Sequence, residues 1–394
     1  MIFLDNVAAP AVPDKHLLPL FFLFSFFAAI GLSFGIHAMI VGHDHVFGTS
    51  REVPWGILIT PYVFFACLST GLCIISTLGQ VFRIKTFAPL VNRAVFLTIT
   101  TMLAGLVTIG LEVENPWRVL IYGIFSANPL SNIWWKSALY TMFVLLMICN
   151  FLFLLMNKTK VARGFAIGAL IAIICGNLNM NSDMALLGSR GFWAENYMPL
   201  FFLIVSTLLG CCVLILQIFF SNVLQDRTID SQTGSSITAI SKLITVLLIG
   251  MLLFCVMKIM GGFSTQFTEN PQAMELLVQG SFAVNFWLGE IFLTVVLPLF
   301  LIVLCWRKKL NILFAFACLS SSVGIFVTFY DLIIVGQLIP HYSQYNLFGY
   351  PEYYSYSPSL HEYMMTLGIF FFFFATSVLG EIILNSTHLR ESKR

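Results

Sequence analysis

Residues 112–118 read EVENPWR and separate two long apolar stretches, at about 88–111 and 133–156. This segment and the start of the next stretch carry the five polar side chains of a candidate catalytic site: Glu112, Glu114, Arg118, Lys136 and Tyr140. Ionisable groups at the edge of an apolar core are costly in free energy, and they usually mark a place of chemistry or transport. The segment therefore predicts two membrane-spanning helices with a functional site where they meet.

The composition of the whole chain supports a membrane location. Of its 394 residues, 59% are hydrophobic and only 10% are charged, and the mean hydropathy is +0.92. A soluble domain carries roughly 25% charged residues. The apolar stretches run about 20 to 28 residues, which is long enough to cross a hydrocarbon core as helices. We expect an integral membrane protein without a large soluble domain, in contact with lipid and not with nucleic acid.

Ten spanning helices are expected, and their number and charge pattern predict the topology. The spans are about 17–41, 55–82, 88–111, 133–156, 161–178, 198–224, 237–262, 276–305, 310–336 and 361–384. An even number places both termini on one side, and Lys and Arg gather in the connections of that side. The positive-inside rule then places both termini in the cytoplasm. We expect a multi-pass, all-α protein of the bacterial inner membrane, with a transmembrane domain at 17–384 between tails at 1–16 and 385–394.

The cysteines and histidines indicate that this chain holds no metal centre. All nine cysteines fall within apolar spans without a CxxC motif, which favours small buried hydrophobic side chains over iron–sulfur ligands. A haem between helices needs facing axial ligands, most often histidines. Only His37 lies clearly within a span, and His361 opens the last one. We therefore expect neither haem nor an iron–sulfur cluster in this chain, and no other metal site.

The outer ends of the first helices offer the groups that quinone chemistry needs. Oxidation or reduction of a quinone moves two electrons and two protons, so the site must hold two oxygens and pass protons to water. A Tyr or His can hold an oxygen, and a carboxylate near the aqueous edge can transfer the proton. The candidates for binding the quinone are His37, Trp55, Tyr62 and Tyr140. The alternative is an ion-pair network of Glu112 or Glu114 with Arg118 and Lys136 that only ties helix ends together.

Several short motifs resemble the NrfD/polysulfide-reductase family of membrane subunits. They are Pro54-Trp55-Gly56, Ser69-Thr70-Gly71, Pro89-Leu90-Val91, the 112–118 segment, Asn128-Pro129-Leu130-Ser131, Leu187-Gly188-Ser189-Arg190, Phe286-Trp287, 335–340 and Tyr356-Ser357-Pro358-Ser359. Glu112 stands at the acidic position of the family's acidic-Leu-Gly-Arg-Pro motif and Pro116 at its proline. The length is similar to that of the ten-helix branch, which includes membrane subunits of uptake hydrogenases and of the Dsr complex.

This resemblance implies an architecture and a set of partners. The family has two four-helix bundles, here about 55–178 and 198–336, with flanking helices and no bound redox cofactor. Menaquinone or ubiquinone binds at the outer end of one bundle. An iron–sulfur, ferredoxin-like subunit docks on the periplasmic face, together with a catalytic subunit such as a multihaem cytochrome or a molybdopterin enzyme. The chain departs from the family pattern at Glu114, Asn115 and Lys136.

The second half of the chain carries ionisable residues that suggest a proton path. Glu290 is expected near mid-membrane, and Lys258 and Asp331 near the outer ends of their helices, where the latter two could pair. A carboxylate there is neutral, paired or joined to water. The alternative to a proton path is a hydrogen-bonded structural carboxylate.

We conclude that the sequence predicts a membrane anchor and quinone-reactive subunit of a respiratory oxidoreductase, which is not catalytic toward the terminal substrate by itself. Proton translocation would accompany electron transfer if the residues around Glu290 form a proton path. The alternative function is a secondary transporter with an inverted five-helix repeat. The sequence PLFFL at 19–23 recurs at 199–203, at the start of helices of opposite direction, as that alternative requires.

Overall fold

The computed structural model describes residues 16–186, 191–193, 197–225, 231–262, 271–308, 311–340 and 351–391. Within these residues the chain is helical and contains no strand. Ten helices are long and apolar enough to span a membrane, as expected. The tail before residue 16, the Leu187–Arg190 motif, the 341–350 part of the last long connection and residues 392–394 lie outside the described part of the chain.

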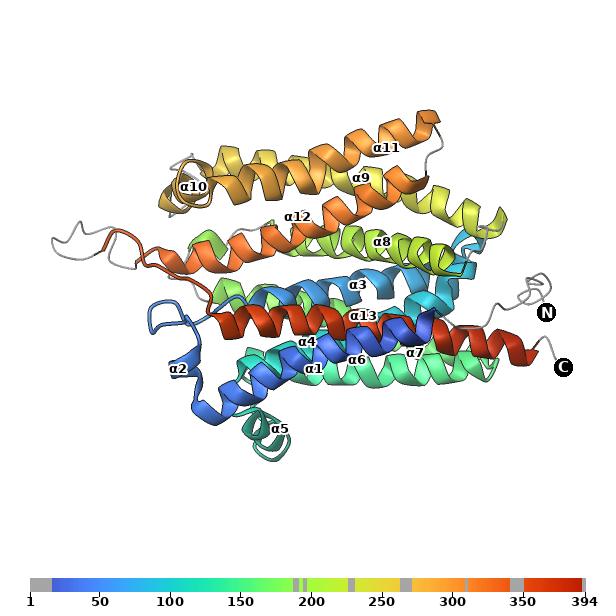
Figure 1. Ribbon diagram of the computed structural model, residues 1–394, viewed down its shortest axis with the longest axis horizontal. Helices are drawn as coiled ribbons and strands as arrows, with labels where there is room; N and C mark the ends of the chain where they lie inside the picture. The colour runs from blue at the N-terminus through green and yellow to red at the C-terminus, as the bar shows by residue number, and fades with distance from the viewer. Residues whose placement is uncertain are drawn as a thin grey trace.

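The spans lie roughly side by side (Figure 1). The helices are α1 (Leu17–Val41), α2 (His43–Val46), α3 (Ile59–Gln80), η1 (Lys85–Leu90), α4 (Val91–Glu112), α5 (Pro116–Phe125), α6 (Asn132–Leu155), α7 (Thr159–Leu186), η2 (Gly191–Trp193), α8 (Met198–Leu224), α9 (Ser231–Gly262), α10 (Pro271–Val278), the π-helix η3 (Asn285–Val296), α11 (Leu297–Lys308), α12 (Asn311–Leu338) and α13 (Leu360–Glu391). We call the end that carries α2, α5 and α10 the outer end, and the opposite end the inner end.

The helices pack in two groups with a flanking pair. One group contains α3, α4, α6 and α7, and the other contains α8, α9, α12 and the continuous η3–α11 helix. The first and last helices, α1 and α13, pack against each other and lie on α4. Helix α3 contacts both groups, and nearly all of its residues are buried. This arrangement makes α3 the centre of the molecule.

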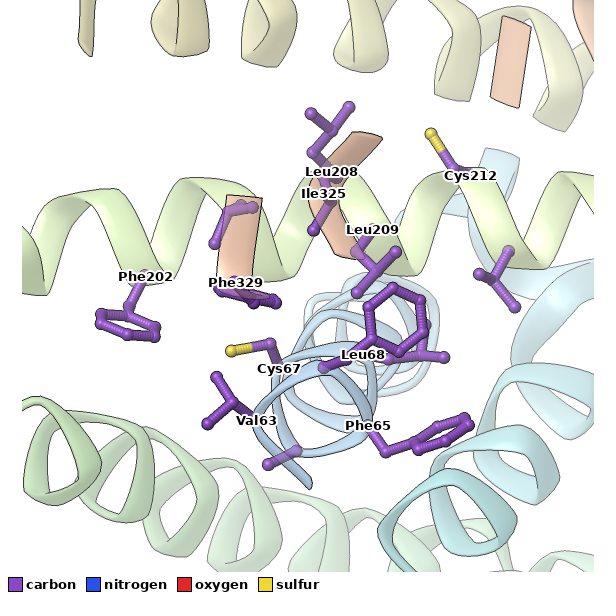
Figure 2. Packing of buried hydrophobic residues seen from close by; sticks show 14 of the residues in the cluster. Val63, Phe65, Cys67, Leu68, Phe202, Leu208, Leu209, Cys212, Ile325 and Phe329 are labelled. Carbon is purple, nitrogen blue, oxygen red and sulfur yellow. The ribbon is translucent and has the colours of Figure 1, made fainter. Parts of the chain in front are cut away.

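The core between the two groups is a close contact of α3 with α8 and α12 (Figure 2). A side chain at Gly71 would collide with the backbone of α8 at Ser206, so glycine permits the two helices to approach closely. The rings of Phe202 and Phe329 stack with their centroids 6.0 Å apart. Because hydrocarbon tails are as apolar as these side chains, close packing rather than removal from water stabilises the contact.

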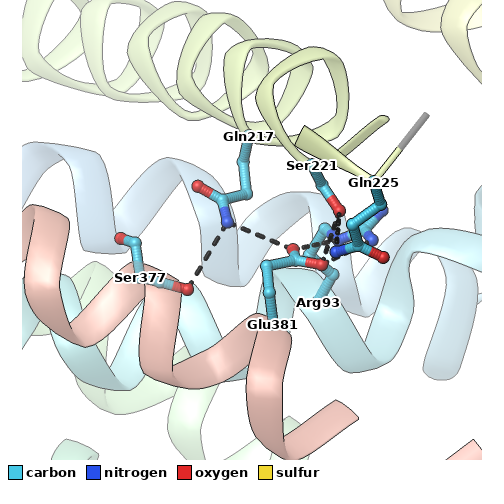
Figure 3. Close-up of polar contacts among 6 residues, drawn as sticks. All are labelled: Arg93, Gln217, Ser221, Gln225, Ser377 and Glu381. Atoms are coloured by element: carbon cyan, nitrogen blue, oxygen red, sulfur yellow. Dashed lines mark hydrogen bonds and ion pairs between the residues drawn. The ribbon is translucent and has the colours of Figure 1, made fainter. Parts of the chain in front are cut away.

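A buried ion pair joins three helices at the inner end (Figure 3). Arg93 of α4 donates from Nε to Oε1 of Glu381 at 2.7 Å and from Nη2 to Oε2 at 3.0 Å. Ser221 and Gln217 of α8 donate to the same carboxylate at 2.8 and 3.1 Å. We call these four residues the inner carboxylate cluster. It fastens the flanking helix α13 to both helix groups.

One local expectation requires correction. The span expected at 276–305 is not a single helix. The short helix α10 ends at Val278, and the membrane-spanning η3–α11 helix starts only at Asn285. Glu290 therefore lies near the outer end of its helix and not at mid-membrane. The segment between α4 and α6 contains the short helix α5, which begins with Pro116 in its first turn and is seen nearly end-on in Figure 1.

Candidate functional site at the outer end

Glu112 is the last residue of α4 and lies at the outer end of the first helix group. The backbone amide of Gly56 lies within hydrogen-bonding reach of its carboxyl group. The other oxygen, Oε2, is buried and has no hydrogen-bond partner among the described residues. A buried polar atom without a partner costs about 1–3 kcal/mol, so such atoms are rare and call for an explanation.

A second carboxylate, Glu362 of α13, lies close enough to Glu112 for the two to interact electrostatically. Glu362 is fully buried, and its oxygens accept three hydrogen bonds. Oε2 accepts from the amides of Gly48 and Ser359, both at 2.8 Å, and Oε1 accepts from the hydroxyl of Tyr356 at 2.6 Å. We call Glu112, Glu362 and Tyr356 the outer carboxylate cluster. Its two carboxylates differ, because both oxygens of Glu362 accept hydrogen bonds whereas Oε2 of Glu112 has no partner among the described residues.

Tyr356 connects this cluster to the start of α3. Its hydroxyl accepts from the amide of Ile57 at 2.6 Å while it donates to Glu362. Burial and the hydrogen bond to the Glu362 carboxylate raise the pKa of Tyr356 well above its ordinary range. The phenol therefore stays protonated and keeps its role as a donor. A Cβ atom at Gly56 would collide with the Tyr356 hydroxyl and the Glu362 carboxylate, so this position requires glycine.

Trp55 links the two helix groups next to the cluster. Its amide donates to Oε1 of Gln337 at 2.9 Å, and its carbonyl accepts from Nε2 of Gln337 at 3.1 Å. Its ring stacks on Trp193 with centroids 5.3 Å apart, and Trp193 donates to the carbonyl of Leu332 on α12 at 2.7 Å. Trp55, a candidate for binding the quinone, is thus held by α12 of the second group.

His37 lies opposite His361 at the outer ends of α1 and α13. Nδ1 of His37 and Nε2 of His361 are 3.1 Å apart, and the rings stack with centroids 5.1 Å apart. His37 is exposed beside Ile36 and Ile40, whose side chains are 57% and 79% exposed on a membrane-spanning helix. The imidazole of His37 therefore faces the region that lipid fills.

The remaining predicted residues separate into two sets. Glu114 and Arg118 are exposed around the start of α5, and Lys136 is half-buried on α6. Tyr62 and Tyr140 are buried in the interior, 6% and 2% exposed. The hydroxyl of Tyr140 lies 3.4 Å from the carbonyl of Gly176 on α7, to which it donates. The structure therefore places Glu112, Trp55 and His37 at the outer ends of their helices, which we call the rim. Tyr140 lies deeper, between α6 and α7.

His43 of α2 lies beside the 112–118 segment. Its ring stacks on Phe47 with centroids 4.3 Å apart. Burial lowers the pKa of His43 below its ordinary value of 6.5, although the negative charges of Glu114 and Asp44 act in the opposite direction. The neutral imidazole is therefore the favoured form in the folded protein.

The ionisable residues of the second group also lie at the outer end. Lys258 donates to both oxygens of Glu290 at 2.9 Å, and its ammonium lies 5.6 Å from the ring centroid of Phe192 and 5.4 Å from that of Phe286. The suggested pairing of Lys258 with Asp331 is therefore corrected, because Glu290 is nearer the outer end than expected. Asp331 accepts from Asn285 at 2.9 Å with one oxygen, while the other is buried without a partner among the described residues.

Sequence reasoning missed Glu362, Tyr356 and Gln337 as site residues. One signal was available, since Ser359 precedes Glu362 by three residues at the start of an apolar run. In the structure the Glu362 amide donates to Ser359 Oγ at 3.2 Å and the Ser359 amide donates back to Glu362, which is a capping box. The motif predicts where α13 begins. It does not predict that the same carboxylate reaches Gly48 and lies beside Glu112.

Comparison with known proteins identifies the family. A model of the polysulphide reductase NrfD family matches residues 45–341. The chain belongs to this family. This confirms the resemblance seen in the motifs, and it favours an oxidoreductase subunit over the transporter alternative.

Two relatives of the chain are named as parts of reductase or oxidoreductase complexes. The selenate reductase of Mesobacillus selenatarsenatis has a subunit that is 24% identical over 363 residues, covering 80% of this chain and 82% of the relative. The Hdr-like menaquinol oxidoreductase integral membrane subunit of Archaeoglobus fulgidus is 24% identical over 359 residues, covering 88% of each chain. The chain is therefore a multi-pass membrane protein similar over most of its length to subunits of oxidoreductase complexes. Among the described residues, no three His, Cys, Asp or Glu side chains are grouped as metal ligands are.

Proposed function

We propose that this protein is the membrane-anchoring, quinone-reactive subunit of a respiratory oxidoreductase of the bacterial inner membrane. It exchanges electrons between an iron–sulfur subunit on the periplasmic face and the quinone pool. The terminal substrate is handled by a further subunit, such as a multihaem cytochrome or a molybdopterin enzyme. The menaquinol oxidoreductase named among its relatives supports menaquinone as the carrier, with ubiquinone as the alternative.

The observation that carries this proposal is the buried, unpartnered oxygen of Glu112 at the rim of the first helix group. A hydroxyl of a quinol, or a water beside it, supplies the hydrogen bond that the protein leaves unmade. A carboxylate so placed takes a proton from the quinol as its electrons leave, and in the reverse reaction it returns the proton. Glu112 is therefore assigned the proton transfer.

The other candidate residues receive roles that their positions allow. His37 and Trp55 hold the quinone at the rim, where one faces the lipid region and the other forms part of the wall between the helix groups. Arg118, Lys136 and Glu114 set the charge at the entrance to water. Tyr62 and Tyr140 stabilise the interior behind the site, and Tyr140 binds a quinone oxygen only if its hydroxyl leaves the Gly176 carbonyl.

The test is quinol turnover by the complex purified from native membranes with its electron-transfer partner. Glu112→Gln keeps the size of the side chain but removes the proton acceptor. We expect the rate of quinol oxidation to fall about 100-fold, which is a typical contribution of a general acid or base. The matched control is Glu352→Gln, an exposed carboxylate outside the assigned site, which should retain nearly the full rate. Equal rates for the two variants would refute the assignment.

The Lys258–Glu290 pair and Asp331 are proposed as a proton path in the second helix group. Two observations support it. The unpartnered oxygen of Asp331 is buried beside the pair, and Glu290 lies in a π-helix, a backbone form often found at functional sites. The alternative is a structural ion pair. Proton uptake and release by reconstituted Glu290→Gln complex decides between them, and values equal to those of the unmodified complex would exclude the path.

A further inference from the structure

The two imidazoles at the outer ends of α1 and α13 form a hydrogen-bonded pair that opens toward lipid on one side. His361 is half-buried in the first turn of α13, behind the exposed His37. Phe34 packs edge-on against the His361 ring with centroids 5.1 Å apart, which fixes the orientation of that ring. We propose that His361 is a second proton carrier of the quinone reaction, which takes the proton that His37 receives and passes it to water. This inference rests on the proposed function.

The contact between α1 and α13 does not depend on the two histidines. Gly31 and Gly368 approach so closely that a Cβ atom at either position would collide with the other's backbone. The rings of Phe27 and Phe371 stack with centroids 4.9 Å apart further along the same pair. Because these contacts already hold the helices together, a hydrogen bond between two imidazoles at the rim is not required for their packing.

The imidazole pair can carry a proton because each ring has two nitrogens. In quinol oxidation, Nε2 of His37 accepts the proton of one quinol hydroxyl. His37 then gives the proton on its Nδ1 across the 3.1 Å hydrogen bond to Nε2 of His361. His361 releases the proton on its own Nδ1 to water at the outer surface. Each ring is then neutral with its hydrogen on Nε2, and exchange of the ring protons with water restores the hydrogen to Nδ1 before the next turnover.

The second proton and the electrons leave by other routes. Glu112 takes the proton of the other quinol hydroxyl, so two protons leave the quinol. The two electrons pass to the iron–sulfur subunit that the proposed function requires, and the quinol becomes a quinone. Quinone reduction uses the same steps in the opposite direction, with protons entering through His361 and Glu112.

The test is quinol oxidation by the complete complex carrying His361→Ala, with and without added imidazole. We expect turnover to fall about 100-fold, the contribution of a general base, with little change in the KM for the quinol. Free imidazole should enter the space left by the side chain and restore at least a tenth of the lost rate. A structural role does not produce such rescue.

Two further variants make the outcome decisive. His361→Phe preserves the aromatic packing against Phe34 but leaves no space, so it should be as slow as His361→Ala and unresponsive to imidazole. His45→Ala removes an exposed histidine of α2 and should leave the rate unchanged. Full turnover by His361→Ala, or a loss that imidazole does not restore, would overturn the role of His361. Absence of quinol turnover by the unmodified complex would instead refute the proposed function.

Discussion

The outer and inner carboxylate clusters place acidic side chains at the two ends of the same helices, but the hydrogen bonds that these carboxylates accept differ. At the inner end, Glu381 accepts from Arg93, Ser221 and Gln217, so both of its oxygens are used. At the outer end, Glu362 is equally satisfied, whereas Glu112 keeps one buried oxygen without a partner among the described residues. A carboxylate whose two oxygens both accept hydrogen bonds from the protein holds helices together. A carboxylate with one oxygen left unpartnered can accept a hydrogen bond from a ligand, and this difference separates a structural ion pair from a candidate reactive site.

The largest expected effect is on the free energy of unfolding, when the buried acid at the inner end is removed. Glu381→Ala leaves Arg93 without its buried partner, so we expect a loss of about 3–5 kcal/mol in the free energy of unfolding. Glu112→Ala should cost less than about 1 kcal/mol, because one of its oxygens makes no hydrogen bond to lose. Thermal unfolding in detergent measures both. Similar losses would show that the two carboxylates do not differ as described.

The second-largest effect is expected from a methyl group placed beside the two outer carboxylates, which should lower both stability and quinol turnover. Gly56→Ala places a Cβ atom against Glu362 and the Tyr356 hydroxyl, and we expect a loss of about 1–3 kcal/mol from this overpacking. Because the displaced groups lie beside Glu112, quinol turnover should fall as well. Gly110→Ala is the matched control, since a Cβ atom there meets nothing within 4 Å. An unchanged melting temperature and rate for Gly56→Ala would contradict the close packing.

A smaller effect is expected from the phenol that bridges the outer cluster. Tyr356→Phe removes the donor to Glu362 and the acceptor for the Ile57 amide, and it should cost about 1–2 kcal/mol. Unfolding by heat measures the loss. Tyr363→Phe, which alters an exposed tyrosine of the same helix, should stay within about 0.5 kcal/mol of the unmodified protein.

The smallest effect is a pH dependence from His43. Since burial lowers its pKa in the folded protein, the unfolded chain binds the proton more readily. The stabilising contribution is complete above the ordinary value of 6.5 and is lost as the pH falls through 6.5 toward the lower folded pKa. The melting temperature of the unmodified protein should fall more than that of His43→Phe between about pH 8 and about pH 5. Parallel curves for the two proteins would contradict this.

The expectations from sequence were correct where apolar length and local motifs decide the structure. The ten spans follow from runs of apolar residues, and the family follows from the order of short motifs. They were wrong where a single helix was drawn through residues 276–305, because hydropathy does not reveal the turn between α10 and η3. The position of Glu290 and its pairing with Lys258 changed as a result.

Apolar runs and short motifs are enough to predict a helical membrane protein of the NrfD family in which Glu112 ends one of the spans. Which carboxylate oxygens find a hydrogen-bond donor follows instead from the packing of the helices. The reason is that the deciding contacts join distant parts of the chain: His37 and His361 are 324 residues apart, and Gly48 and Glu362 are 314 residues apart. Hydropathy and motifs describe neighbours along the chain, whereas the partners of a buried polar atom depend on how the helices pack.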